Sequence, residues 1–134
     1  MATIKPTSKH AGPSARDLTP YQWRAAKFVG AASSGDSATA EQDQQIDVAG
    51  AGDRVEGIIE YPGDAQGRPT TILNGGRLKV KLGYPGQAGD AIKAGAGGIA
   101  IKAGAGEPSF GRLMEAGPSG AIVPFDFDRS NAPA

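Results

Sequence analysis

The chain has 134 residues, which suffices for one compact domain with a flexible arm but not for two domains of ordinary size. Its formal net charge is zero and it has no cysteine, so disulfides, thiolate nucleophiles and cysteine metal sites are excluded. No apolar run approaches the ~20 residues that cross a bilayer, and residues 1–20 lack the apolar stretch of a secretory signal, so a soluble protein without a membrane partner is expected.

Glycine is abundant and aromatic residues are scarce: the chain has 21 glycines, and aromatic residues make up 6% of it. Many positions therefore add little side-chain area to a core, and the isolated subunit is expected to be only modestly stable. Partner subunits would compensate, because anything that binds only the folded state shifts the equilibrium toward it. The composition favours a protein that works in an assembly.

Charge is unevenly distributed along the chain. Residues 1–35 carry five bases against one acid, whereas residues 36–64 carry eight acids against one base. A nucleic-acid binder normally has a concentrated basic face with interleaved aromatic residues. The N-terminal bases are too dispersed for that, so nucleic acid is not expected as a partner.

Residues 1–20 are expected to form an extended arm, because three prolines lie among small polar residues without apolar periodicity. The arm is either a frayed terminus or a segment that orders on contact with a neighbouring subunit. The candidate partner-interface residues are basic and aromatic side chains of the arm and of the segment after it: Lys5, Lys9, His10, Arg16, Tyr21, Trp23, Arg24 and Phe28.

A first strand is predicted over residues 21–29, where Tyr21 and Trp23 begin an alternating pattern. This tryptophan is the only one in the chain, and packing in a core or subunit interface is a more common role for such a residue than ligand stacking. A small, polar loop follows, and then a short strand at 45–48.

Alternation is clearer in the middle of the chain, where strands are predicted at residues 54–60 and 70–73. The sequence Asn74-Gly75-Gly76 that follows is a strong β-hairpin signal. In the next predicted strand, at 77–84, apolar residues alternate with Arg77, Lys79 and Lys81. One face of this strand should be buried and the other basic.

Turn signals recur in the second half. An Ala-Gly-Asp turn occurs at residues 51–53 and again 37 residues later, at 88–90. A short strand at 98–102 places Ile99 and Ile101 on one face.

A final pair of strands is predicted at residues 110–116 and 120–127. Because proline cannot donate to a β-ladder, Pro124 indicates that the last strand lies at an edge or contains a bulge. Short strands joined by Gly, Pro and Asn turns predict an all-β fold, a small β-barrel or β-sandwich over residues 21–128, with the extended arm at 1–20 and a loose C-terminal tail at 129–134.

The residues of common catalytic and metal sites are missing. The only histidine, His10, lies in the proline-rich arm, where nothing holds it beside a nucleophile or a second metal ligand. The acidic stretch does not match a calcium-binding loop, and the glycine clusters lack the residues of a phosphate-binding loop. No enzymatic activity, cofactor or metal is therefore expected.

From residue 51 onward, the order of motifs resembles the small capsid decoration (cement) proteins of tailed phages. The matching pieces are Gly-Asp-Arg-Val-Glu-Gly-Ile-Ile at 52–59, Gly-Arg-Leu-Lys-Val at 76–80, Ala-Gly-Asp-Ala-Ile at 88–92, Gly-Ile-Ala-Ile at 98–101 and Gly-Arg-Leu-Met-Glu-Ala-Gly at 111–117. No single piece is specific, but the ordered set is. The chain departs from the pattern in its long proline-rich N-terminal arm and in Pro124.

This resemblance implies a β-barrel-like (β-tulip-like) body without catalytic residues. It further implies homotrimers at the local three-fold positions of the virion's outer capsid surface, where they would bind the major capsid protein. Two alternatives stay open. One is a carbohydrate- or surface-binding module that uses Tyr21, Trp23 and Tyr61, and the other is an enzyme that works with carboxylates alone.

Overall fold

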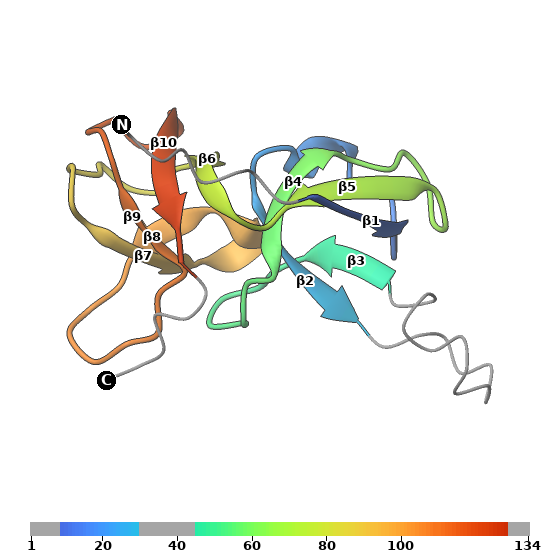
Figure 1. Cartoon of the computed structure of the whole chain (residues 1–134), viewed down its shortest axis with the longest axis horizontal. Coiled ribbons are helices and arrows are strands. Elements are labelled where there is room, and N and C mark those ends of the chain that lie inside the picture. Colours follow the sequence, from blue (N-terminus) through green and yellow to red (C-terminus); the bar gives the residue numbers. More distant parts are fainter. Residues whose placement is uncertain (1–8, 30–44, 129–134) are drawn as a thin grey trace, which may run out of the picture.

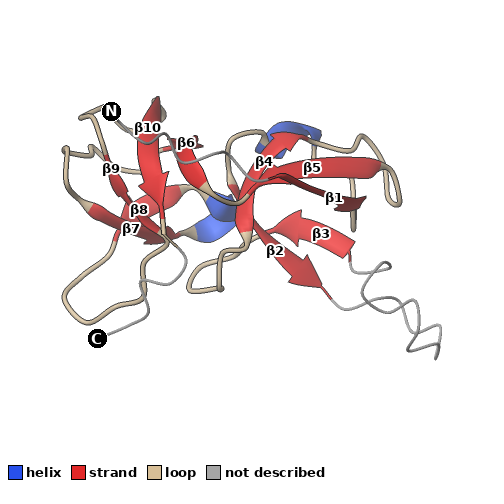
Figure 2. Ribbon diagram, in the orientation of Figure 1, coloured by secondary structure: helices blue, strands red, loops and turns tan. Residues whose placement is uncertain are grey.

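The computed structural model describes residues 9–29 and 45–128. Regular structure in these residues consists of ten β-strands and two short 3-10 turns, which confirms the predicted all-β fold class (Figures 1 and 2). Within the same residues, no helix has the length and apolar character needed to cross a membrane. The elements are β1 (Lys9–Pro13), η1 (Thr19–Tyr21), β2 (Ala25–Val29), β3 (Gln45–Val48), β4 (Gly57–Tyr61), β5 (Pro69–Leu73), β6 (Gly76–Lys81), β7 (Ala91–Ala94), η2 (Ala96–Gly98), β8 (Ala100–Lys102), β9 (Gly111–Leu113) and β10 (Ile122–Phe127).

The strands form two antiparallel five-stranded sheets, with the orders β1-β5-β4-β2-β3 and β6-β10-β9-β7-β8. Figure 1 shows them as two bodies side by side along the long axis of the molecule. We call β1–β5 unit A and β6–β10 unit B. Neither sheet closes into a barrel through a continuous ladder, so the architecture is sandwich-like rather than a barrel.

Unit B repeats unit A strand by strand. The first sheet becomes the second when β1 to β5 are replaced, in order, by β6 to β10. The pairing registers repeat as well, since Ala26 lies opposite Val48 in unit A and Ile92 lies opposite Lys102 in unit B. The chain is therefore a tandem pair of one five-stranded unit.

Each sheet also curls in the same way. A single parallel bridge connects the end of the first strand to the third strand, between Ser14 and Ile46 in unit A and between Leu82 and Ala100 in unit B. At these bridges Ala15 N–H donates to the Ile46 carbonyl and Gly83 N–H donates to the Ala100 carbonyl, both at 2.8 Å.

One face of the curled sheet is buried in unit B, whereas unit A buries side chains on both faces. The predicted inward residues of β6 are buried, and Phe125 and Phe127 face them from β10 and pack edge to face with ring centroids 6.2 Å apart. In unit A a separate cluster fills the inside of the sheet: Leu18, Ala26, Ile46, Ile59 and Ile72. The outer face of unit A is also apolar, and Ala25, Ile58 and Leu73 join the main core together with residues of unit B.

The strand predicted over residues 21–29 is wrong in its first half. Residues 19–21 form the 3-10 turn η1, with Pro20 in its first turn, and β2 begins only at Ala25. Trp23 between them has a φ of 63°, a left-handed conformation that ends any extended pattern. The alternation of Tyr21, Trp23 and Ala25 is thus not the alternation of a strand.

The hairpin predicted at residues 74–76 does not form. β5 pairs with β1 and β4 in unit A, whereas β6 pairs with β10 in unit B. The Asn-Gly-Gly segment is the connection between the two units, and Gly76 has a φ of 83°. The segment does turn, as its glycines predict, but the two strands that it connects bury their apolar faces in different sheets.

One further expectation for unit B needs correction. β10 is an interior strand, not an edge, and Pro124 is tolerated because pairing between β10 and β9 ends at Phe125. The Pro124 carbonyl accepts a hydrogen bond from Met114 N–H, but Pro124 has no N–H to return the reciprocal bond, and the pairing of β10 with β9 ends there. In the 98–102 segment Ile99 and Ile101 share one face, as predicted, and are half-buried, whereas Gly98 and Ala100 are buried.

Candidate interaction surfaces

The N-terminal candidate interface residues that the structure describes lie on unit A. β1 adds to the sheet beside β5, and the segment after it carries Leu18, which is fully buried. The extended arm predicted for 1–20 therefore contains a strand of the body from residue 9 onward, whereas Lys5 lies outside the described residues. Lys9 forms an exposed ion pair with Glu60 at 3.4 Å, and the His10 ring packs edge to face on Phe28 with centroids 5.2 Å apart.

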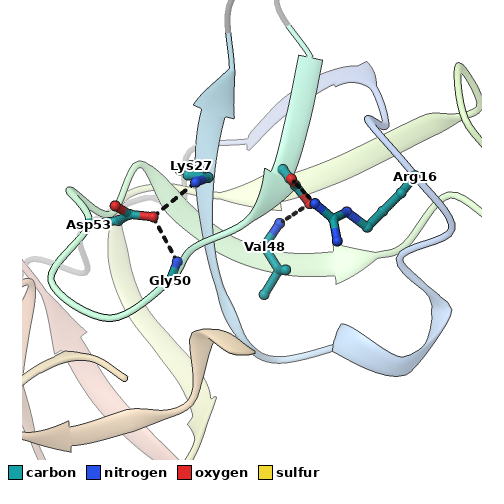
Figure 3. A network of polar contacts seen from close by, with 6 residues as sticks. Arg16, Lys27, Val48, Gly50 and Asp53 are labelled. Atoms are coloured by element: carbon teal, nitrogen blue, oxygen red, sulfur yellow. Dashed lines mark hydrogen bonds and ion pairs between the residues drawn. The ribbon is translucent and has the colours of Figure 1, made fainter. Parts of the chain in front are cut away.

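Arg16 ties the segment after β1 to β3. Its guanidinium donates to the Asp47 carboxylate at 2.8 Å, and the Asp47 side chain is only 7% exposed (Figure 3). Val48 N–H donates to the other oxygen of the same carboxylate. A nearly buried carboxylate needs such partners, so Arg16 has a structural contact within the chain.

A second network on the same unit is repeated in unit B. The Asp53 carboxylate accepts a hydrogen bond from Gly50 N–H at 2.8 Å and pairs with Lys27 at 3.0 Å (Figure 3). The hydrogen bond from Gly50, followed by that from Lys27, holds the pKa of Asp53 below its ordinary value. At the equivalent place in unit B, Glu107 accepts from Gly104 N–H and pairs with Lys93.

Tyr21, Trp23 and Arg24 lie where the two units meet. The Trp23 carbonyl accepts a hydrogen bond from Lys81 N–H at 2.8 Å, and its half-buried ring packs against the main core. Arg24 donates to the Gly97 carbonyl of η2 at 3.1 Å, and its guanidinium carbon lies 5.4 Å from the centre of the Tyr21 ring. The structure thus brings these three residues together in a contact within the chain. Their role against a partner stays a prediction.

The predicted basic face of β6 exists and extends over two neighbouring strands. Arg77 and Lys79 are exposed and Lys81 is half-buried on the outer side of the sheet. Asp126, Pro124 and Ile122 of β10 lie opposite them, and Arg112 of β9 lies opposite Asp126. We call the following residues the basic face: Arg77, Lys79, Lys81, Arg112, Met114 and Ile122.

Sequence reasoning missed the contribution of β9 and β10 to this face. Met114 and Ile122 are 37% and 47% exposed, which is unusual for large apolar side chains in the described residues. Ile122 and Met114 were assigned to strands, but only the register of β10 against β6 brings them beside the lysines. The pairing of β6 with β10 could not be predicted from the sequence, because the turn signal between β5 and β6 favours pairing of those two strands instead.

The remaining titratable contacts are structural. Tyr84 donates to Asp90 at 2.8 Å, and burial followed by this carboxylate raises the pKa of Tyr84 well above its ordinary value. The same hydrogen bond, with one from Gln87 N–H, lowers the pKa of Asp90. No group of three His, Cys, Asp or Glu side chains in residues 9–29 and 45–128 is placed to hold a metal ion.

No protein-family model matches the chain, and no curated protein sequence matches it. A solved structure does match: the head fiber gp8.5 N base of bacteriophage phi29, with a TM-score of 0.70 and 17% sequence identity. The alignment covers 96% of this chain and 98% of that chain, so both five-stranded units are included. At this level of identity the likeness concerns the fold.

Proposed function

We propose that the chain is a non-catalytic structural protein of a phage head, located on the outer surface of the capsid. The observation that carries the proposal is the fold match over both units to the base of a phage head fiber. The motif order from residue 51 onward supports the same class of protein on independent grounds, because it depends on sequence and not on the fold.

We further propose that the partner is the major capsid protein, that the chain decorates and stabilises contacts between its subunits, and that it does so as a homotrimer at local three-fold positions. A protein on a capsid adds contacts across seams between subunits, and a body of two five-stranded sheets suits this task. An interface of standard size, about 800 Å² per partner, would supply the binding energy. Neither nucleic acid nor a membrane is a partner in this proposal.

The test uses heads of the phage that encodes the chain, prepared without this protein. Purified chain should sediment with these heads to a saturating stoichiometry that is a multiple of three per local three-fold position. Light scattering of the free protein should give the mass of a trimer. Protein that stays in the supernatant at every concentration would contradict a role on the head.

An alternative function is a carbohydrate- or surface-binding module, which the 63% exposed Tyr61 favours. The half-buried Trp23 at the junction of the units is less suited to stacking on a sugar. Binding on a glycan array that Tyr61→Ala abolishes, together with no binding to heads, would decide for this alternative.

A further inference from the structure

Basic side chains in the described residues fall into two groups. Seven form ion pairs with acids of the same chain: Lys9, Arg16, Lys27, Arg54, Arg68, Lys93 and Lys102. Among the other bases of residues 9–29 and 45–128, Arg24 contacts η2 and Tyr21, and the rest all lie on the basic face. Arg77, Lys79 and Lys81 pair with no acid of the described residues.

The lysines of the basic face border exposed apolar side chains. Lys79 and Lys81 lie opposite Pro124 and Ile122 in the ladder, and Met114 N–H bonds to the Pro124 carbonyl. Paired side chains of adjacent strands are neighbours on one face of a sheet, so the lysine ammonium groups border the apolar side chains. Charged side chains beside exposed apolar ones are typical of a protein-binding surface.

The same face of the fold already binds a partner in unit A. There Ala25, Ile58 and Leu73 are buried in the core shared with unit B. The registers place Arg112 and Asp126 of unit B at the positions of Ile58 and Leu73. The face that holds a neighbouring β-unit in unit A is thus exposed and charged in unit B.

Another β-unit of this kind fits this face poorly, because its apolar contact surface would cover the charged side chains of Arg112 and Asp126. Among the described residues of a second copy, Asp47, Asp53 and Glu60 already pair with bases of their own chain. The occupant must bring its own negative charge and an apolar centre.

We propose that the basic face is the docking surface of this chain for an acidic protein surface with an apolar centre. The proposal deepens the proposed function and rests on it for the source of that surface, a subunit of the phage head. Binding through this face is sensitive to salt, because Arg77, Lys79 and Arg112 are exposed and their charges are screened by ions.

The test compares two double variants for binding to heads that lack the protein. Lys79→Glu with Lys81→Glu reverses the charge of the basic face at two positions, and no acid lies opposite either of them. Arg54→Glu with Arg68→Glu changes the net charge equally on unit A, where both side chains are exposed. The first pair should weaken binding roughly tenfold or more, and the second by less than about twofold. Ile122→Ser should weaken binding without changing its dependence on salt.

Each outcome separates the two proposals. If wild type and both double variants bind heads equally, the docking surface is wrong while the proposed function stands. If wild type does not bind heads, both fall. If the face variant binds heads normally but loses affinity for a 20-bp DNA duplex, the face is a nucleic-acid site and the proposal is overturned. Equal thermal unfolding midpoints of the variants establish that a loss of binding is not a loss of folding.

Discussion

At the scale of single residues, three carboxylates close turns of the same form. Asp53, Asp90 and Glu107 each accept a hydrogen bond from the backbone N–H three residues earlier. Each turn has a glycine with positive φ at its third position, which few other residues adopt without strain. Each carboxylate also accepts a hydrogen bond from a nearby side chain, which belongs to Lys27, Tyr84 or Lys93. Such bonds favour the ionised carboxylate.

We predict that these turns make the fold sensitive to acid. Their hydrogen bonds lower the pKa of each carboxyl in the folded state, so the stabilisation is complete above the unfolded pKa of about 4 and is lost as the pH falls through the folded pKa. The urea midpoint should therefore fall between pH 5 and pH 3. A triple variant, Asp53→Asn with Asp90→Asn and Glu107→Gln, should show a smaller fall. Replacing the exposed Glu115 and Asp126 by their amides is the control, and an equal effect there would contradict the assignment.

Gly98 of unit B lies directly against β2 and β3 of unit A. It has a φ of 76°, and a Cβ there would lie 2.6 Å from Val48 Cγ2 and 2.7 Å from the Ala25 carbonyl oxygen. We predict that Gly98→Ala destabilises the fold by roughly 2–4 kcal/mol, because left-handed strain adds to a steric conflict with backbone.

Gly106→Ala is the matched control. Gly106 has a φ of 78°, but a Cβ there meets nothing within 4 Å. Its cost should be the left-handed strain alone, about 1–2 kcal/mol. Equal losses for the two variants in urea unfolding would show that the close approach at Gly98 contributes nothing.

At the scale of elements, β1 and the segment after it make contacts that an N-terminal deletion would remove. The strand pairs over five residues with β5, Ser14 Oγ donates to the Ala65 and Arg68 carbonyls, and Leu18 is fully buried. Deleting residues 1–20 should lower the thermal midpoint by about 10 °C or more, because losing a buried leucine alone costs roughly 2–5 kcal/mol. Deleting residues 1–8 removes none of these contacts and should leave the midpoint within about 2 °C. A large loss from the shorter deletion would contradict this division.

Strands with one buried face could be predicted from the sequence, and strands held mainly by their backbone could not. The alternation of Leu78 and Val80 with basic residues predicts β6, whose inner side chains are buried. β1 has the sequence Lys-His-Ala-Gly-Pro and exposes its first three residues, so no apolar period marks it. Its stabilisation comes from the ladder with β5, which composition does not reveal.

At the scale of the whole molecule, the tandem repeat is nearly invisible in the sequence. The clearest trace is Ala-Gly-Ala-Gly-Asp at 49–53 against Ala-Gly-Ala-Gly-Glu at 103–107. The inward positions conserve summed volume, not identity: Ala26 and Ile46 of unit A correspond to Ile92 and Ala100 of unit B. A core accepts such exchanges when total volume is kept. The two Ala-Gly-Asp segments found in the sequence form turns of the same kind. These turns lie at positions that are not equivalent in the repeat.

The two units share a face at which apolar and charged residues exchange places. Ile58 of unit A is fully buried in the main core, whereas Arg112 at the equivalent position of unit B is exposed. A charged outer face is typical of the terminal unit of a stacked repeat, because it prevents further stacking. Stacking a further unit on this face of unit B would therefore cover a charge where unit A buries an isoleucine.

We predict opposite responses to the reciprocal substitutions. Ile58→Arg places an unpaired charge in the shared core and should cost about 4 kcal/mol or more. Arg112→Ile loses only a surface hydrogen bond to the Gly89 carbonyl and should change stability by less than about 1 kcal/mol.

Trp23 fluorescence reports the junction and far-UV circular dichroism reports both sheets. The two urea transitions should coincide in the wild type, because one core contains residues of both units. Separate transitions in the wild type, or equal costs for the two variants, would mean that the units fold independently of the face they share.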